Sequence, residues 1–327
     1  KKHLLNGKPK RTADLKGLVP SVTFTPDDLE LAKGAMSVRR AALDALGSQL
    51  SANHYLIRRD YEKVLRHKNR LLKDEAPAAL VGAMNETLVT CGAQLSCYRA
   101  ALFEKLAASM ASYYAEITDG HERLDAGFVP SWEEHDPLSF ATRTFGRDEA
   151  REALADALAR RGGEERVRKR ALVGPHADRI EFFIDGKNAA LFGSQGQQRS
   201  VVLAFKLAEA TLIQDFLRQK PVLLLDDVMS ELDAARRRAL VAFISGDIQT
   251  FITTTNLAYF DDDLLGGARI VELEKPRKTG EMPDEDRMFH VKHSPIDAQP
   301  ARGEAEERDG QPSDPAEQPS ARIEGDS

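Results

Sequence analysis

An apolar run that ends on two acidic residues, PVLLLDDVMSELD at 221–233, limits the folds open to this chain. Four consecutive apolar residues at 222–225 are typical of a strand that is buried on both faces, as in a parallel sheet covered by helices. Such a strand ends at the carboxyl edge of its sheet, where ligands bind in folds of this kind. The pattern therefore predicts that Asp226 and Asp227 stand at a binding edge.

The residues around this strand alternate between strand-like and helical patterns. A helix is predicted over 148–160 and another over 197–216, and a third follows the apolar strand at 234–243. The other strands are predicted at 171–173, 180–184, 189–192, 250–254, 269–273 and 287–291. This alternation favours an α/β fold in which helices connect parallel strands.

The first half of the chain is mostly helical in pattern. After a strand at 19–23, Thr25 and Asp28 form a capping-box signature for a helix that ends at Gly34. A further helix starts at Ser37, and two long amphipathic helices are predicted over 51–73 and 87–117. Two such helices joined by a short link predict an antiparallel helical arm.

The chain opens with Lys1 inside a predicted hairpin, KKHLLNGKPKR, in which Asn6-Gly7 is a type I′ turn signal. A first strand of about five residues with nothing before it leads us to expect that an N-terminal segment is missing. A natural start after removal of methionine is the alternative.

Charge and composition exclude few classes of function. The net charge of −6 resides in residues 294–327, which hold nine acids and three arginines, so the rest of the chain is balanced. The composition of that tail predicts disorder. Neither a membrane-length apolar run nor a signal peptide is present, so we expect a cytoplasmic protein. Cys91 and Cys97 lie on different faces of one predicted helix, which argues against a disulfide or metal site.

A second polar motif, SQGQ at 194–197, stands at the predicted start of a helix. A helix N-terminus offers free N–H groups and partial positive charge, which suit phosphate oxygens. Gly196 lets that backbone approach an anion closely, and Ser194 and Gln197 add neutral donors. A simple N-cap accounts for the serine but leaves the glycine and the glutamines without a role.

The two adjacent carboxylates have a chemistry that complements this anion site. One can hold Mg²⁺, directly or through water, while the other polarises a water molecule for attack on a phosphate. An Asp-Asp pair alone could equally cap the next helix. The surrounding string, from the apolar strand to Ser230 and Asp233, is much rarer than its parts.

Taken together, these stretches resemble the signature motif, Walker B strand and D-loop of an ABC-class ATPase, in wording close to the RecF family of DNA replication and repair proteins. The resemblance covers residues 1 to about 293. It rests on the following blocks, in the family's order: NGKPKR (6–11), FTPDDLELAKGAMSVRRAALD (24–44), LVGPHADRIEFFIDGK (172–187), SQGQQRSVVLAFKLAE (194–209), LLLDDVMSELDAARRRAL (223–240) and QTFITTTN (249–256).

The resemblance implies an α/β fold, namely part of an ABC/SMC-like P-loop NTPase head with an inserted α-helical lobe. It implies four segments: a remnant of the N-terminal ATPase lobe (1–24), the helical lobe (25–147), the C-terminal ATPase lobe (148–293) and the acidic tail (294–327). It also implies ATP and Mg²⁺ as cofactors. The implied partners are gapped or single-stranded and double-stranded DNA, a second copy in an ATP-dependent homodimer, and the mediators RecR and RecO. The implied role is mediator loading in recombinational repair and the SOS response.

The resemblance also assigns roles to individual residues. Asp226 binds Mg²⁺ through water, Asp227 is the catalytic carboxylate, and Ser230 and Asp233 belong to the D-loop that bridges the dimer. Thr254 or Thr255 replaces the switch histidine of transporters as a sensor of the γ-phosphate. The residues that contact the γ-phosphate bound to the partner protomer are Ser194, Gly196 and Gln197.

One departure from the family pattern concerns the P-loop. No G-x-x-x-x-G-K-[ST] motif occurs in the 327 residues, and in the family this loop precedes the hairpin. We therefore expect ATPase activity from the complete protein and none from this chain alone.

The basic clusters are ambiguous, because a solvated helix face explains most of them as well as a phosphate contact does. Candidate DNA contacts are Lys8, Lys10, Arg11, Arg39 and Arg40. Three other functions remain open: an ABC transporter subunit, a non-hydrolysing module that binds DNA or a partner, and a metal nuclease that uses Asp226, Asp227 and Asp233.

Overall fold

A computed structural model of the chain describes residues 3–10, 15–133, 144–245, 248–260, 262–273 and 290–292. The chain divides into two compact units, Lys1–Phe260 and Asp261–Ser327. The acidic tail predicted to be disordered, and Arg11 among the candidate DNA contacts, lie outside the described residues. The four-segment division inferred from the sequence remains a proposal.

The central sheet of the first unit has three parallel strands in the order β3 (Ser21–Phe24), β7 (Val222–Asp226) and β8 (Thr250–Thr253). The pairing aligns Val22 with Leu223, and both side chains are buried on the face of the sheet that helix α7 (Gln195–Leu217) covers. This confirms the predicted α/β class with a parallel sheet.

The opposite face of this sheet is open in the described part of the chain. Thr23, Leu224 and Phe251 form one row across the three strands, and Leu224 and Phe251 are 37% and 56% exposed. The expectation that residues 222–225 are buried on both faces is therefore wrong for Leu224. Its side chain alternates to the face that α7 does not cover.

A second, antiparallel sheet contains β4 (Leu124–Val129), β5 (Arg179–Ile184) and β6 (Lys187–Asn188). Asp185 and Gly186 make the predicted turn between β5 and β6, with φ of 47° and 76°.

Two of the predicted strands are wrong. Residues 189–192 form the short helix α6 (Ala189–Phe192), because the side chain of Asn188 caps the N–H of Ala190 at 3.0 Å. Residues 171–173 pair with no strand, because Asn69 and Glu165 side chains accept the N–H groups of Ala171 and Leu172.

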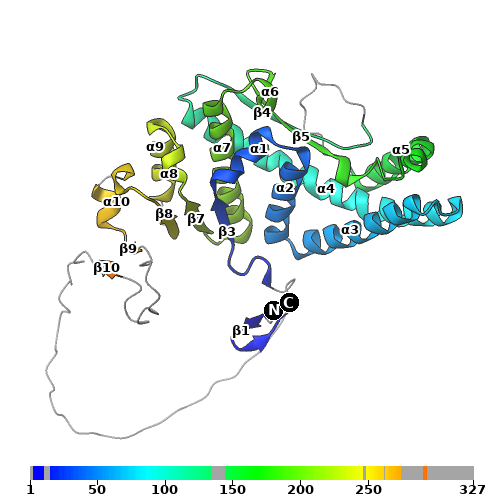
Figure 1. The fold of residues 1–327 in the computed structure, drawn as a ribbon, viewed down its shortest axis with the longest axis horizontal. Coiled ribbons are helices and arrows are strands. Elements are labelled where there is room, and N and C mark those ends of the chain that lie inside the picture. Colours follow the sequence, from blue (N-terminus) through cyan, green and yellow to red (C-terminus); the bar gives the residue numbers. More distant parts are fainter. Residues whose placement is uncertain are drawn as a thin grey trace, which may run out of the picture. The chain divides into compact units, whose positions relative to one another are not determined.

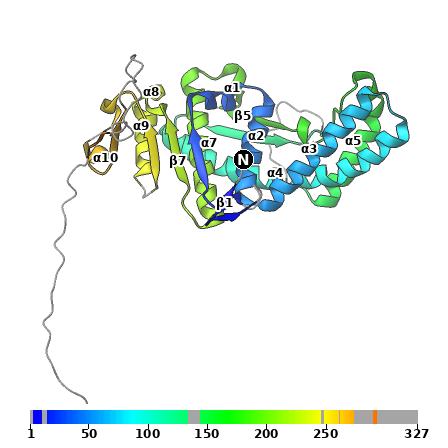
Figure 2. The ribbon, with the colours of Figure 1, turned by 60° about the horizontal axis from the view of Figure 1, so that its bottom comes forward.

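Three helices, α3 (Ala52–Lys73), α4 (Ala78–Ile117) and α5 (Arg147–Arg168), lie side by side and form the helical arm (Figures 1 and 2). Ser51 caps α3 as predicted, whereas α4 begins nine residues before the expected position. A shared apolar cluster holds the arm together, with Tyr61 from α3, Leu88 and Leu95 from α4, and Leu154 from α5.

Buried ion pairs stabilise the arm, both between its own helices and against its neighbours. Arg99 of α4 donates to both carboxylate oxygens of Asp44 at 2.9 and 2.6 Å and pairs with Asp178 at 3.3 Å. Lys68, which interrupts the apolar stripe of α3 in the sequence, is fully buried and pairs with Glu165 of α5 at 2.6 Å. Each of these four buried residues, Asp44, Arg99, Lys68 and Glu165, therefore has an opposite charge beside it.

The remaining elements of the first unit connect these layers. The hairpin β1 (Leu4–Leu5) and β2 (Lys8–Pro9) has the predicted turn, with positive φ at Asn6 and Gly7. The predicted helix after Thr25 is split into η2 and α1. The helical segments are η2 (Pro26–Leu29), α1 (Glu30–Lys33), α2 (Met36–Leu50), η3 (Pro175–Ala177), α8 (Val228–Glu231), α9 (Ala234–Ile244) and η4 (Leu257–Tyr259).

The described part of the second unit contains α10 (Asp262–Gly266) and the antiparallel pair β9 (Ile270–Glu272) and β10 (His290–Lys292). The predicted strand at 269–273 is confirmed within one residue at each end. The strand predicted at 287–291 overlaps β10, and its first three residues lie outside the described chain.

Candidate functional site

The two carboxylates at the end of β7 meet the last residue of the neighbouring strand. Thr253 of β8 donates its hydroxyl to Asp226 Oδ1 at 2.6 Å. The backbone N–H of Asp227 lies 3.1 Å from both the carbonyl and the hydroxyl oxygen of Thr253. A single threonine therefore fixes both acidic residues at the carboxyl edge of the sheet, where the sequence placed them.

Asp227 has an unusual conformation. Its φ of 50° places it in the left-handed region, which residues other than glycine seldom occupy. Its Oδ1 is buried and has no hydrogen-bond partner in the described chain. An unsatisfied polar atom and a strained backbone at one residue are typical of a functional position.

This pair of carboxylates fits a hard cation such as Mg²⁺, because oxygen donors remain that the protein itself does not use. Asp226 is exposed and Asp227 is half-buried, so both can be reached from solvent. Among the described residues, no group of three or more His, Cys, Asp and Glu side chains is placed to hold a metal ion. Further ligands would therefore come from water or from a bound phosphate.

The SQGQ motif forms the N-terminus of α7, as predicted. The Ser194 hydroxyl accepts the N–H of Gln197 at 3.2 Å, and the Gln197 side chain accepts the N–H of Ser194 at 2.8 Å. This reciprocal capping box satisfies two N–H groups of the first turn. The Gln197 amide also donates to Glu122 Oε1 at 2.8 Å, so a carboxylate already lies beside the helix start.

A hollow of about 250 Å³ opens at this helix start. Its lining includes Ser194, Gly196, Gln197 and Asp233, four of the residues that the sequence assigned to ATP and dimer contacts. Asp226 and Asp227 do not line it. The structure thus groups these four residues around one hollow, whose lining does not include the two carboxylates at the end of β7.

Arg236 of α9 closes one side of this hollow. Its guanidinium donates to Ser200 at 2.9 Å and pairs with Asp233. A side chain on Gly196 would come within 3.1 Å of that guanidinium. The absence of a side chain at Gly196 therefore leaves room for the guanidinium of Arg236, and the predicted approach of an anion to this glycine stays a prediction.

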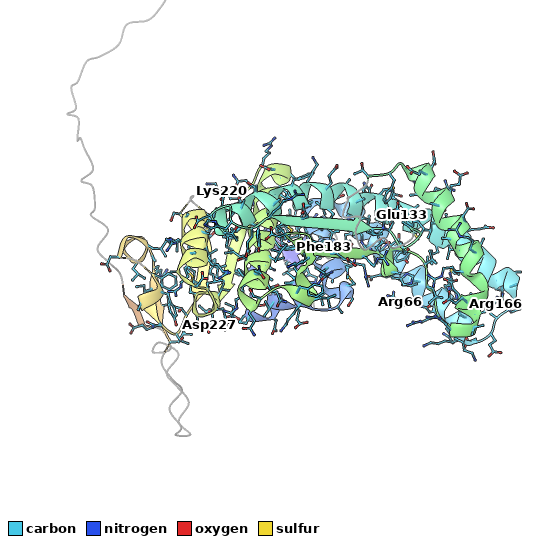
Figure 3. The ribbon with its side chains drawn as sticks, turned by 90° about the horizontal axis from the view of Figure 1, so that it is seen from above. Arg66, Glu133, Arg166, Phe183, Lys220 and Asp227 are labelled. Atoms are coloured by element: carbon cyan, nitrogen blue, oxygen red, sulfur yellow. The ribbon has the colours of Figure 1, made fainter. Side chains whose placement is uncertain are left out.

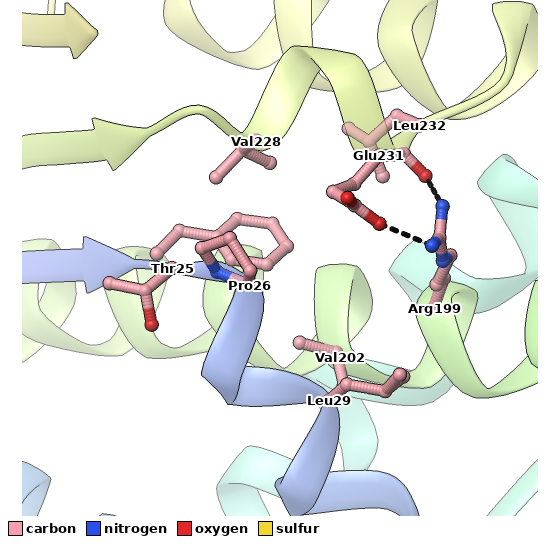
Figure 4. A pocket seen from close by; sticks show the side chains of 9 residues that line it. Thr25, Pro26, Leu29, Arg199, Val202, Val228, Glu231 and Leu232 are labelled. Carbon is pink, nitrogen blue, oxygen red and sulfur yellow. Dashed lines mark hydrogen bonds and ion pairs between the residues drawn. The ribbon is translucent and has the colours of Figure 1, made fainter.

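The helix start and the carboxylate edge are linked through a short bridge. Arg199, one turn into α7, bonds both the carbonyl and the carboxylate of Glu231 at the end of α8 (Figure 4). This pair lies over a small apolar pocket of about 30 Å³ whose lining includes Phe24, Val202 and Val228. The bridge therefore ties the first turns of α7 to the end of α8, the helix that contains Ser230.

The other predicted residues serve local structure in this state. Ser230 donates to the carbonyl of Asp227 at 2.8 Å, and Asp233 caps α9 through the N–H of Arg236 at 2.9 Å. Thr254 closes a turn with the backbone of Asn256, and Thr255 is exposed.

The candidate DNA contacts differ in how far their side chains are exposed. Lys8 and Lys10 are exposed, and Arg40 is half-buried with a hydrogen bond to the carbonyl of Asp178. Arg39 as a DNA contact is contradicted, because it is 1% exposed and its guanidinium donates to three carbonyls. A guanidinium used in this way holds α1, α2 and β5 together.

Sequence reasoning missed Thr253, Glu122 and Arg199. Thr253 stands one residue before the predicted sensors, and only the register of β8 against β7 shows that it meets the carboxylates. Glu122 follows α4 in a turn, and no local pattern links it to a motif 75 residues away. The spacing of Arg199 from Glu231 gives no signal either.

The relatives and the solved structures that are similar to this chain point to one protein family. No protein-family model matches the chain. The DNA replication and repair protein RecF of Lactobacillus delbrueckii subsp. bulgaricus is 36% identical over 265 residues, which cover 80% of this chain and 68% of the relative. The chain belongs to the RecF family. RecF of Rippkaea orientalis is 35% identical over 281 residues, which cover 81% and 71%.

A solved structure of this family supports the assignment. The recombination mediator protein RecF with ATPrS, of the RecFOR pathway, superposes with a TM-score of 0.70 at 31% identity, covering 78% of this chain and 68% of that one. RecF with ATP gives 0.69 at the same identity. The fold class expected from the sequence is confirmed, and the family is one of DNA replication and repair. Within the part of the chain described here, no helix is long and apolar enough to cross a membrane.

Proposed function

We propose that this RecF-family chain forms part of an ATP-dependent, DNA-binding protein of replication and recombinational repair. The names of its relatives and the nucleotide-bound structures of RecF support the proposal. The observation that carries it is the hollow at the start of α7, where Ser194, Gly196 and Gln197 meet Asp233. Two of the alternative functions have no support in the described residues. No contact there favours a transporter subunit, and no cluster of three acidic side chains there favours a metal nuclease.

The proposed ATP site is completed between two copies of the protein. On this proposal the N-terminus of α7 in one copy contacts the γ-phosphate held by the other, with Ser194, Gly196 and Gln197 as donors. Asp233 and Ser230 belong to the segment that bridges the copies. The side-chain amide of Gln197 already donates a hydrogen bond to the Glu122 carboxylate, which supports the capacity of this residue to hold an anionic oxygen.

The carboxylate edge supplies the other half of the chemistry. Asp226 would hold Mg²⁺ through water, and the ion would neutralise phosphate charge. Asp227 would orient and polarise the attacking water, and its buried Oδ1 makes no hydrogen bond within the described chain that would compete with this role. Thr254 and Thr255 remain candidates for sensing the γ-phosphate. RecR and RecO, as members of the named pathway, are the proposed mediator partners, and DNA is the proposed substrate surface.

The test uses Ser194→Arg in the protein expressed from its complete reading frame. The bulky cation would fill the hollow at the helix start, so ATP-dependent dimerisation and hydrolysis should fail while nucleotide affinity of the single copy is kept. Ser37→Arg, an exposed residue in the first turn of α2, is the matched control and should behave as wild type. Sedimentation with and without ATP and nucleotide titration measure both properties. Dimerisation of the Ser194→Arg protein at the wild-type ATP concentration would contradict the proposed site.

A further inference from the structure

The three helices of the arm differ sharply in charge. Helix α3 has seven basic and two acidic residues, α4 has two and three, and α5 has six of each. All three pack around one apolar cluster, so packing alone does not account for the excess on α3. The rest of the chain outside its acidic tail is electrically balanced. This local excess indicates a surface that meets negative charge.

The cations of α3 share one face. Five exposed residues follow each other at spacings of four, three, four and three, and we call them the basic stripe: Arg59, Lys63, Arg66, Arg70 and Lys73. This spacing keeps them on a single line along the helix, about 21 Å long.

The buried residues of α3 lie on the opposite side. They are His54, Tyr61, Lys68 and Leu72, which face the rest of the arm. The stripe therefore points straight away from the arm into solvent.

Most of this charge is not neutralised by the protein. Lys63, Arg66 and Lys73 make no ion pair within the described residues. Arg59 pairs with Asp60 at 2.9 Å and Arg70 with Asp74 at 3.6 Å, and all four of these side chains are more than half exposed. Exposed pairs of this kind are weak, so both arginines can exchange their partner for a stronger one.

The chemistry of the face selects the partner. No exposed large apolar residue lies on α3, whereas a protein interface is built around apolar or aromatic anchors. Single-stranded nucleic acid is bound through aromatic side chains on which bases stack, and the stripe has none. A row of long cations without apolar neighbours matches a duplex backbone, which carries one negative charge per about 1.7 Å of its axis.

We propose that the basic stripe of α3 binds the phosphate backbone of double-stranded DNA, without reading its sequence. The inference rests on the proposed DNA function but is independent of the nucleotide half-site. Figure 3 shows Arg66 in the half of the first unit that also contains Arg166, well separated from Asp227, so a variant in the stripe leaves the carboxylate edge untouched. Arg39 is buried and cannot reach DNA, so the exposed basic stripe is the better candidate for contacts with DNA.

The experiment measures binding of the full chain to a fluorescent 30-base-pair duplex by anisotropy, over a series of salt concentrations. The test variant is Lys63→Gln/Arg66→Gln/Lys73→Gln. The matched control is Arg151→Gln/Arg160→Gln/Arg166→Gln on α5, which removes the same charge from exposed residues of the neighbouring helix. Thermal unfolding should be unchanged in both variants, because all six side chains are exposed.

The stripe variant should bind at least about tenfold more weakly near 0.1 M salt. The slope of log affinity against log salt should fall by about 2 to 3, close to 0.9 for each lost phosphate contact. The control should stay within about twofold of wild type. Equal effects of the two variants, or stronger stripe-dependent binding of poly-glutamate or of single-stranded DNA, would overturn the inference alone. Absence of any duplex binding by the wild-type chain would contradict both the inference and the proposed DNA function.

Discussion

The base of the helical arm and the edge of the central sheet both carry aspartates, Asp44 and Asp227, in very different surroundings. Asp44 is 3% exposed, receives two hydrogen bonds from Arg99 and lies 3.1 Å from His54. Burial by itself would raise the pKa of Asp44, but the neighbouring Arg99 and His54 outweigh it and hold that pKa well below its usual range. Asp227 instead keeps a buried oxygen without a partner and a left-handed backbone.

This contrast separates architecture from chemistry. A carboxylate whose bonds are all satisfied inside the protein fixes the helices around it and has nothing left for a ligand. A carboxylate that is held by its backbone, with its side chain left incomplete, costs stability and stays available to water or a cation. The same residue type therefore serves two purposes, and the difference lies in which of its atoms are used.

The strongest test of the contrast makes the same substitution at both positions. Asp44→Asn should lower the free energy of unfolding by about 3 to 5 kcal/mol, because it leaves Arg99 buried without its main partner. Asp227→Asn should leave stability within about 1 kcal/mol of wild type, since asparagine also tolerates the left-handed region. It should slow ATP hydrolysis by about 10² to 10⁴-fold in the protein from the complete reading frame.

Urea unfolding and steady-state hydrolysis measure the two effects. Arg59→Ala, which breaks only an exposed pair with Asp60, is the control for stability and should cost less than about 1 kcal/mol. Similar losses of stability at Asp44 and Asp227 would remove the distinction between the two regions.

Glu209 of α7 offers an intermediate case, a buried acid with an incomplete partner. Burial raises its pKa to about 7, although Lys206, 3.9 Å away, acts in the opposite direction. The folded protein therefore holds a proton on Glu209 that the unfolded chain releases above about pH 4.5. The resulting contribution to stability is fully present below that pH and is lost as the pH rises through about 7.

Glu209→Gln should remove this pH dependence. The stability of the variant relative to wild type should rise by about 3 kcal/mol between pH 4.5 and pH 7.5, since one pKa unit corresponds to about 1.4 kcal/mol. Urea unfolding at four pH values measures the difference, in which all other titrating groups cancel. The exposed Glu104→Gln serves as control and should run parallel to wild type. A constant difference across the pH range would show that Glu209 is not the acid that titrates.

Local patterns in the sequence predicted the parts of this molecule that depend on neighbours along the chain. The caps at Ser51 and Ser194 and the turns at Asn6-Gly7 and Asp185-Gly186 all rest on contacts within a few residues.

Contacts between distant segments were beyond such patterns. Lys68 looked like a break in an apolar stripe, because its partner Glu165 lies on another helix. Residues 171–173 looked like a strand, because the side chains that satisfy its N–H groups come from elsewhere. Arg39 looked like a surface cation for the same reason, since two of its three carbonyl partners precede it and the third is 141 residues away.

The prediction with the smallest expected effect concerns Thr253, which supports the Asp226 carboxylate at the edge of the sheet. Thr253→Val keeps the shape of the side chain but removes the donor to Asp226 and one acceptor for the N–H of Asp227. The loss of one satisfied hydrogen bond at an exposed edge should cost about 1 kcal/mol of stability. Without this tether the Asp226 carboxylate is free to rotate, so the affinity of the protein for Mg²⁺-nucleotide should fall several-fold.

Thr253→Ser restores the hydroxyl and should recover wild-type affinity, which separates positioning from mere packing of the strand. Thr254→Val breaks only the turn with Asn256 and should leave the Mg²⁺ dependence unchanged. Nucleotide titration at a series of Mg²⁺ concentrations distinguishes the three variants. If Thr254→Val shifted the Mg²⁺ dependence and Thr253→Val did not, the threonine that supports the carboxylates would be the later one, and the register of β8 would not be what positions them.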